Sequence, residues 1–136
     1  MIGEFINLGI AVEDIDAAVE RYERAFGWTR EGEVRTEPGM GIKFVVLNAA
    51  GLKIELLSPL PGETTLRRFL DTRGEGLFRL AFAAEDFDGA LAQLAANGVR
   101  YVDVSSASGR GAGNRIAFTH PKSAHGVMLE LVEGHE

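Results

Sequence analysis

The order of apolar and polar positions along the chain predicts a strand followed by a helix, and this arrangement occurs twice. Residues 5–12 and 77–84 are strand-like in length and apolar content. Each segment runs into a Glu-Asp-apolar-Asp sequence, and aspartate is one of the residue types that begin helices. We expect the helices over about 17–26 and 89–96, each ended by a glycine, Gly27 or Gly98. Further strands are predicted at 42–47, 52–57, 115–119 and 127–132.

These elements belong to an internal repeat. Residues 5–19 match residues 77–91 without a gap, and 52–57 match 127–132, so two copies of one supersecondary unit are the simplest explanation. We predict a single domain, 1–136, made of pseudo-repeats at about 4–62 and 76–133 and linked by a short helix near 64–72. The connecting segments are read as a four-residue hairpin loop at 48–51, a strand or loop within 31–41, and a Ser/Gly-rich loop at 105–113.

Alternation along the strands separates an apolar face from a face that carries isolated polar residues. Asn7 shares the second face of the first strand with the small residues Gly9 and Ala11, and Arg79 takes the equivalent place in the repeat. Glu55 and Glu130 are likewise equivalent in the closing strands. If the repeats pair about a pseudo-twofold axis, these four side chains converge on one cavity. The alternative, common for an isolated glutamate, is a solvated sheet face.

Charge and composition narrow the class of partner. The net charge of -6 argues against nucleic acid or an acidic membrane surface as partner. The 136 residues contain no cysteine, no apolar stretch of about 20 residues and no signal-peptide pattern. We expect a cytoplasmic protein whose partner is a small molecule.

Four stretches carry a resemblance to a known family: NLGIAVEDIDAAVERYERAFGW, KIELLSPL, FLDTRGEGLFRLAF and GAGNRIAFTHPKSAHGVMLEL. The chain resembles the vicinal oxygen chelate superfamily of glyoxalases, extradiol dioxygenases and bleomycin-resistance proteins, and within it the methylmalonyl-CoA epimerases. The resemblance implies an α+β fold in which two βαβββ modules form a curved mixed sheet around a cavity. It also implies a homodimer, as in related epimerases, although two modules in one chain can complete a cavity alone.

The family's metal site is altered in this sequence. The resemblance implies ligands of the order His, Glu or Gln, His and Glu, and the two histidine positions hold Asn7 and Arg79. The carboxylate positions are kept as Glu55 and Glu130, and the position of the family's proposed catalytic glutamate aligns with Phe44.

Arginine stays protonated in proteins and pairs well with carboxylates. We therefore predict that Arg79 replaces the missing cation and pairs with Glu55, Glu130 or both, in a site with no metal and no other cofactor. If a metal is bound, Glu55, Glu130 and Asn7 are its expected ligands.

Two classes of function remain open. In the first, Glu130 and Glu55 are catalytic and move a proton on a small carbonyl or acyl substrate, while Arg79, Asn7 and Phe44 bind it, as in an isomerase, epimerase, cyclase or lyase. In the second, the protein binds a small molecule without turnover, as drug-sequestering resistance proteins do. A metal-dependent epimerase or glyoxalase-like enzyme is a further alternative.

Two basic side chains and a histidine lie outside this set. Arg110 and Arg115 flank the Ser/Gly-rich loop, either as solvated charges or as contacts for an anionic ligand. His120, which precedes a proline, is predicted to stabilise a turn.

Overall fold

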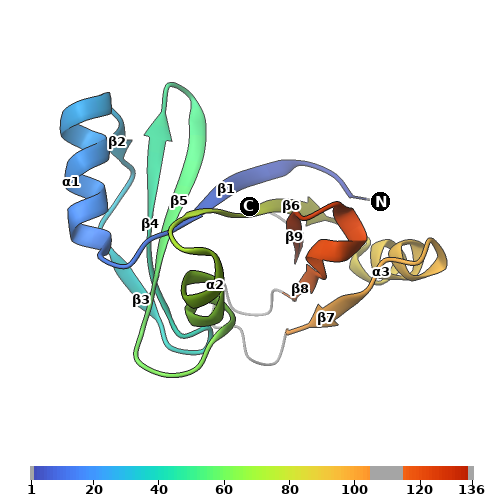
Figure 1. Ribbon diagram of the computed structural model, residues 1–136. Helices are drawn as coiled ribbons and strands as arrows, with labels where there is room; N and C mark the ends of the chain where they lie inside the picture. The colour runs from blue at the N-terminus through green and yellow to red at the C-terminus, as the bar shows by residue number, and fades with distance from the viewer. Residues whose placement is uncertain (1, 105–114, 135–136) are drawn as a thin grey trace. The chain divides into compact units, whose positions relative to one another are not determined.

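The computed structural model describes residues 2–104 and 115–134 and has the predicted α+β composition (Figure 1). The described residues form three α-helices and one 3-10 helix: α1 (Ile15–Phe26), α2 (Thr65–Arg73), α3 (Phe87–Ala96) and η2 (Pro121–Ala124). The strands are β1 (Phe5–Ala11), β2 (Thr29–Arg30), β3 (Arg35–Glu37), β4 (Ile42–Ala49), β5 (Leu52–Pro59), β6 (Gly76–Ala84), β7 (Tyr101–Asp103), β8 (Ile116–Thr119) and β9 (Met128–Glu133). The loop predicted at 105–113, with Arg110, lies outside the described residues. No helix in the described part of the chain is long and apolar enough to cross a membrane.

The chain forms two compact units, and the same strand pattern occurs in both. One unit comprises residues 7–78, where β1 pairs in parallel with β5, β5 pairs with β4, and β4 also pairs with β2 and β3. The other comprises residues 1–6 and 79–136, where β6 pairs in parallel with β9, β9 with β8 and β8 with β7. The sheet of each unit is therefore mixed, with its parallel pair formed by the opening and closing strands of one sequence repeat.

The first residues of the chain contribute to the second of these units. The Gly3 N–H donates to the Ala83 carbonyl, and the Ala83 N–H donates to the Glu4 carbonyl, both at 2.8 Å. The start of the chain thus extends the edge of the sheet that β6, β9, β8 and β7 form.

Helices α1 and α3 each begin directly after an aspartate that caps the first turn. The Asp14 carboxylate accepts from the Ala17 N–H at 3.1 Å, and the Asp86 carboxylate accepts from the Gly89 N–H at 3.0 Å. These caps satisfy backbone donors that would otherwise lack a partner in the first turn. Both helices therefore begin two residues earlier than the sequence pattern predicted.

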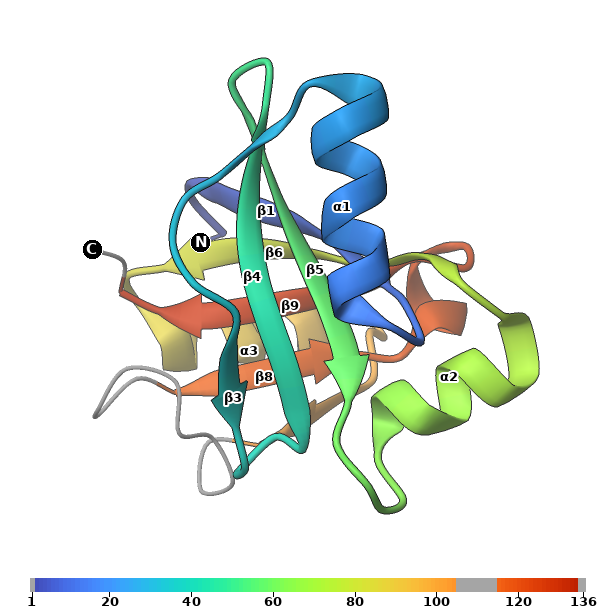
Figure 2. The same ribbon diagram turned by 90° about the vertical axis from the view of Figure 1, so that its left-hand side faces the viewer.

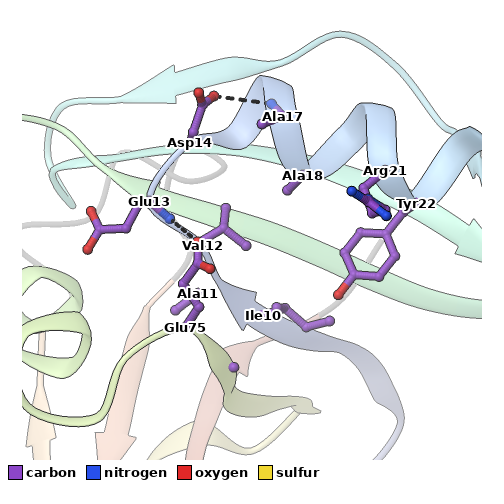
Figure 3. Close-up of a pocket in the computed structure, with 11 residues that line it drawn as sticks. Ile10, Ala11, Val12, Glu13, Asp14, Ala17, Ala18, Arg21, Tyr22 and Glu75 are labelled. Atoms are coloured by element: carbon purple, nitrogen blue, oxygen red, sulfur yellow. Dashed lines mark hydrogen bonds between the residues drawn. The ribbon is translucent and has the colours of Figure 1, made fainter. Parts of the chain in front are cut away.

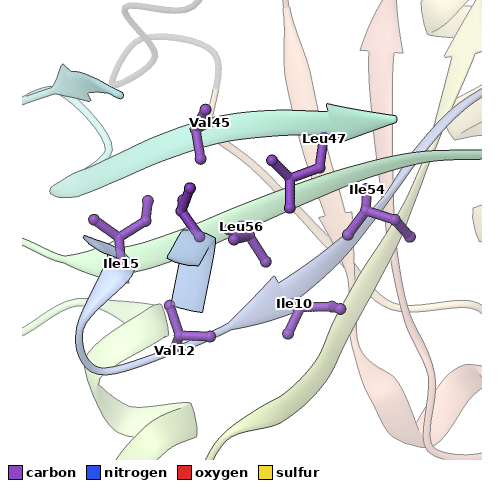
Figure 4. Close-up of a cluster of buried hydrophobic side chains, with 8 residues drawn as sticks. Ile10, Val12, Ile15, Val45, Leu47, Ile54 and Leu56 are labelled. Atoms are coloured by element: carbon purple, nitrogen blue, oxygen red, sulfur yellow. The ribbon is translucent and has the colours of Figure 1, made fainter. Parts of the chain in front are cut away.

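Helix α1 covers one face of the sheet in the unit of residues 7–78, as both views of the ribbon show (Figure 1, Figure 2). The apolar side chains that point toward α1 come from alternate positions of β1, β4 and β5 (Figure 4). The buried cluster consists of Ile10, Val12, Ile15, Val19, Val45, Leu47, Ile54 and Leu56. The intervening positions of the same strands must therefore point to the opposite face.

The hairpin between β4 and β5 is tighter than predicted. The two strands continue to Ala49 and from Leu52, so the connection has two residues, Ala50 and Gly51, and not four. Ala50 has a φ of 56° and Gly51 a φ of 98°. Positive φ values at both central residues are typical of tight two-residue hairpin turns. The Asn48 side chain stabilises the turn by accepting from the Gly51 N–H at 2.7 Å.

Candidate functional site

Arg79 and Glu130 form a buried ion pair within one unit. In the β6–β9 register Ala81 lies opposite Glu130, so Arg79, two residues before Ala81, points to the same face as Glu130. The Arg79 Nε lies 2.7 Å from the Glu130 Oε1, and each side chain is only 1% exposed. The predicted pairing of Arg79 with Glu130 is therefore confirmed.

This ion pair lies on the sheet face opposite α3. The core beneath α3 is built from the alternate positions of the same strands, Ala84, Ala117 and Leu131, together with Phe87, Ala90 and Leu91 of the helix. Burying two charges costs several kcal/mol each before their attraction is counted, roughly the scale of a whole domain's stability. Apolar residues would fill the same space at lower cost, so the pair points to a role beyond packing.

Asn7, Phe44 and Glu55 share one face of the sheet in the unit of residues 7–78. Glu55 lies opposite Gly9 on β1 and opposite Val46 on β4. Asn7 and Phe44 lie two residues from these partners and so point the same way. Asn7 is 8% exposed and Glu55 is 3% exposed. The residue between them on this face of β1 is Gly9, which has no side chain.

The same face becomes apolar toward α2. Ala11, Ile42 and Leu57 of the sheet pack against Leu66 and Leu70 of α2, and Phe44 packs against this cluster. Phe44 therefore lies at the boundary between the apolar end and the polar middle of the face. The prediction that this face and the Arg79–Glu130 pair share one cavity stays a prediction.

Lys53 also points to this face, but its ammonium forms a salt bridge with Glu31. Its ammonium lies 2.6 Å from the Glu31 Oε1, and this hydrogen bond, with a second from Asn48, lowers the pKa of Glu31. Lys53 is thus paired with Glu31 at the outer end of β5 and not with Glu55.

A further buried polar residue on this face, Glu37, was missed by the sequence reasoning. Glu37 ends β3, lies opposite Ile42 in the β3–β4 register, and is only 5% exposed. Because paired side chains in a sheet point the same way, Glu37 faces the same side as Ile42, Phe44 and Glu55. The sequence signal was present in the alternation of Arg35-Thr36-Glu37 just before Pro38-Gly39, within a stretch read only as polar strand or loop.

A separate surface groove of about 480 Å³ lies beside α1 (Figure 3). Ile10, Val12 and Ala18 form apolar parts of its lining, while Glu13, Asp14 and Glu75 make part of it acidic. Its lining includes none of the predicted site residues, and Asn7, Glu37 and Glu55 lie on the other face of this sheet. We therefore place the candidate site by its chemistry, because a groove of this size does not by itself identify one.

Two residues outside the candidate site have structural partners. The His120 Nδ1 accepts from the Lys122 N–H at 3.1 Å and begins η2, which confirms the predicted turn role. Arg115 contacts Asp88 at 2.7 Å and Asp103 at 3.0 Å, and these hydrogen bonds raise the pKa of Arg115. Arg115 is therefore paired with two carboxylates of the protein itself, and this structure gives no support to a role in binding an anionic ligand.

Comparison with known proteins identifies the class of protein that this fold defines. The model of the glyoxalase/bleomycin resistance protein/dioxygenase superfamily matches residues 7–118, and the chain belongs to this superfamily.

Its relatives include acyl-CoA epimerases. The chain is 30% identical to an ethylmalonyl-CoA/methylmalonyl-CoA epimerase of Cereibacter sphaeroides, covering 96% of this chain and 98% of that one. A solved methylmalonyl-CoA epimerase from Mycobacterium tuberculosis is similar with a TM-score of 0.81 and 33% identity, covering 99% and 90% of the two chains. A Streptomyces coelicolor methylmalonyl-CoA epimerase in complex with 2-nitronate-propionyl-CoA gives a TM-score of 0.82 and 30% identity over the full length of both chains.

A guanidinium occupies the position at which the resemblance implied a second metal ligand. In the unit that holds Glu130, a guanidinium lies against the carboxylate where a second ligand is expected, and arginine has no lone pair to offer a cation. Within residues 2–104 and 115–134, no group of three or more His, Asp or Glu side chains is arranged to hold a metal ion.

Proposed function

We propose that this protein is an acid/base enzyme of the isomerase, epimerase, cyclase or lyase kind, which moves a proton at the carbon next to a carbonyl group. The observation that carries the proposal is the placement of Glu55 and Glu130, 3% and 1% exposed, on the strand faces opposite α1 and α3. Burial of a carboxylate in such a place lowers the stability of the fold, and a role in proton transfer from carbon is one reason for a protein to retain it.

Each polar residue has a role in this proposal. Glu55 or Glu130 takes the proton from carbon and becomes a neutral acid, while the electron pair of the broken C–H bond moves onto the carbonyl oxygen. The hydrogen-bond donor that stabilises this oxyanion is the Asn7 amide where Glu55 is the base and the Arg79 guanidinium where Glu130 is the base. Phe44 offers an apolar surface for the part of the substrate that does not react.

We further propose that the substrate is a small acyl thioester and that the reaction proceeds without a bound divalent metal. The acyl-CoA substrate class is suggested by the relatives, which act on ethylmalonyl-CoA and methylmalonyl-CoA. The metal-free site is supported by the Arg79–Glu130 contact, since the guanidinium already provides the positive charge next to that carboxylate.

The test is hydrogen exchange at the α-carbon. We expect the protein to catalyse uptake of deuterium from D₂O into methylmalonyl-CoA, measured by mass spectrometry against the reaction without protein. Pretreatment with EDTA leaves the rate unchanged, because no step needs a metal.

Three other outcomes separate the alternatives. Tight binding of 2-nitronate-propionyl-CoA without exchange into any acyl-CoA supports a sequestering protein. Loss of exchange after EDTA, with one divalent ion per chain found by elemental analysis, supports a metal-dependent epimerase. A lack of both binding and exchange argues against acyl thioesters as the substrate class.

A further inference from the structure

Arg35 is an exposed cation on the same sheet face as Glu55, and the proposed reaction assigns it no role. In the β3–β4 register Arg35 lies opposite Phe44, and paired side chains of neighbouring strands point the same way. Among the described residues its guanidinium has no hydrogen bond or ion pair, even with Glu37, which lies two residues further along the same face. The Arg35 side chain is therefore available to a ligand.

The other basic side chains on the described strands of this unit are either paired or turned to the opposite face. Arg30 and Lys53 each form an ion pair with a glutamate. Lys43 lies two residues before Val45 of the core under α1, so it points to the α1 side. Arg35 is thus the one cation on these described strands that faces the candidate site without a partner.

An apolar strip connects Arg35 with Glu55. Strand β4 lies between β3 and β5 (Figure 2), and its residues Val46 and Phe44 are the respective partners of Glu55 and Arg35. Val46 and Phe44 are half-buried, so they expose apolar surface between the two charged side chains. Strand spacing and rise place the Cα atoms of Arg35 and Glu55 about 12 Å apart. A ligand whose reacting carbon lies at Glu55 therefore meets Arg35 with a group several bonds from that carbon.

The charge of the protein favours a cation at this place if the ligand is anionic. The chain has a net charge of -6, and two buried glutamates, Glu37 and Glu55, lie on this face. Both features disfavour a negatively charged ligand unless a nearby cation compensates. Arginine is suited to that role, because its planar guanidinium can bind two oxygens of a carboxylate or phosphate at once.

We propose that Arg35 binds an anionic group of the substrate, a phosphate or a carboxylate, at the β3 edge of the face that carries Glu55. This inference rests on the proposed function with Glu55 as the base. The phosphates of coenzyme A lie far enough from the reacting carbon, as does a carboxylate at the far end of a dicarboxylic acyl chain. A carboxylate on the reacting carbon itself, as in methylmalonyl-CoA, lies too close to Glu55 to be the group that Arg35 holds.

The test compares Arg35→Ala with Arg21→Ala, which removes another exposed cation of the same unit, one on α1 that is also unpaired among the described residues. Calorimetry measures the binding of 2-nitronate-propionyl-CoA and of the same acyl group on pantetheine, which lacks the phosphates. A second pair of probes, glutaryl-pantetheine and butyryl-pantetheine, differs in the distal carboxylate. We expect Arg35→Ala to weaken binding of the anionic member of one pair about 10-fold, the effect of one charge-assisted hydrogen bond, while the other member changes less than about 2-fold. Arg21→Ala binds every probe as the wild type does.

The pair that responds identifies the anionic group. A loss confined to the CoA thioester assigns a phosphate to Arg35, and a loss confined to glutaryl-pantetheine assigns a carboxylate. Binding of all four probes that is equal in Arg35→Ala and the wild type overturns the proposal. An equal loss for butyryl-pantetheine, which has no anionic group, also overturns it, because Arg35 would then act through the structure of the site.

Deuterium exchange into methylmalonyl-CoA separates this inference from the proposed function. If Arg35 holds a phosphate, Arg35→Ala raises KM about 10-fold and keeps the maximal rate, because Arg35 does not contact the reacting carbon. A lower maximal rate at an unchanged KM contradicts a binding role. Selective binding through Arg35 without exchange in the wild-type protein overturns the proposed function and leaves the anion-binding role standing. A wild-type protein that binds none of the four probes overturns both.

Discussion

Replacement of Arg79 by alanine is expected to lower the free energy of unfolding by about 3–5 kcal/mol, since it leaves a buried carboxylate without its cation. Arg79 and Glu130 are both 1% exposed and lie 2.7 Å apart, so water cannot take over the role of the guanidinium. A loss of this size is a large part of the stability of a typical domain. Urea unfolding followed by circular dichroism measures it.

The matched control is Arg24→Ala at an exposed ion pair. Arg24 lies 3.1 Å from Glu20, but the two side chains are 79% and 66% exposed, and we expect a change below about 0.5 kcal/mol. The double variant Arg79→Met with Glu130→Met is expected to regain most of the lost stability, because no buried charge is left over. A loss below about 1 kcal/mol in Arg79→Ala would show that Glu130 does not depend on this cation.

The double variant also separates the two classes of function. If the ion pair is only a structural brace, a stable Met/Met protein retains its ligand binding. If the pair belongs to the reacting site, the same stable protein loses deuterium exchange. The two results are distinguishable because stability and exchange are measured on one variant.

Replacement of Glu55 by glutamine is expected to slow α-proton exchange by roughly 10²–10⁴-fold, the range found when a general acid or base is removed. Glutamine has nearly the same shape and keeps hydrogen-bonding atoms at this 3%-exposed position, so the fold is expected to survive. What it loses is the ability to accept a proton from carbon. Mass spectrometry of methylmalonyl-CoA incubated in D₂O gives the rate.

Glu63→Gln provides the comparison for this variant. Glu63 belongs to the same unit, its side chain is 81% exposed, and its nearest cation is 3.9 Å away, so its replacement leaves the rate unchanged. Exchange at an undiminished rate in Glu55→Gln would remove Glu55 from the catalytic set, and the proton transfer would then have to be assigned to another carboxylate.

The buried polar residues of the candidate site lie on one side of each sheet. Long helices cover the other side, where alternate positions supply the apolar cores under α1 and α3. The polar positions face away from the cores under α1 and α3, while α2 packs on the side of Asn7 and Glu55. This separation explains how Asn7 and Arg79 stand in strands whose apolar pattern is otherwise intact.

Much of the fold was predictable because its signals are local. Alternation within β1 and β6 assigned Asn7 and Arg79 to the faces opposite the helices, since side-chain direction in a strand depends only on sequence parity. Aspartates marked the helix starts because a cap acts on backbone groups three residues away. The gapless repeat indicated two equivalent units, and the same strand pattern is found in both.

The remaining features depend on pairing between segments that are distant in sequence. The length of the β4–β5 hairpin loop depends on how far along the two strands their pairing continues. The composition of residues 48–51 does not reveal this length. The choice of Glu130 as a partner of Arg79 required the β6–β9 register. Glu37 was overlooked because its burial comes from the register of β3 on β4 and from the turn beside α2, not from its neighbours in the chain.

The sequence by itself thus determined the repeat, the element types and the side of each strand on which the polar residues lie, because these follow from backbone periodicity. Tertiary structure alone decided which charges meet and which are removed from water. Register and packing bring Arg79 against Glu130 and enclose Glu37 on the face of Glu55. No local pattern in the sequence encodes these contacts, because they join segments that are distant along the chain.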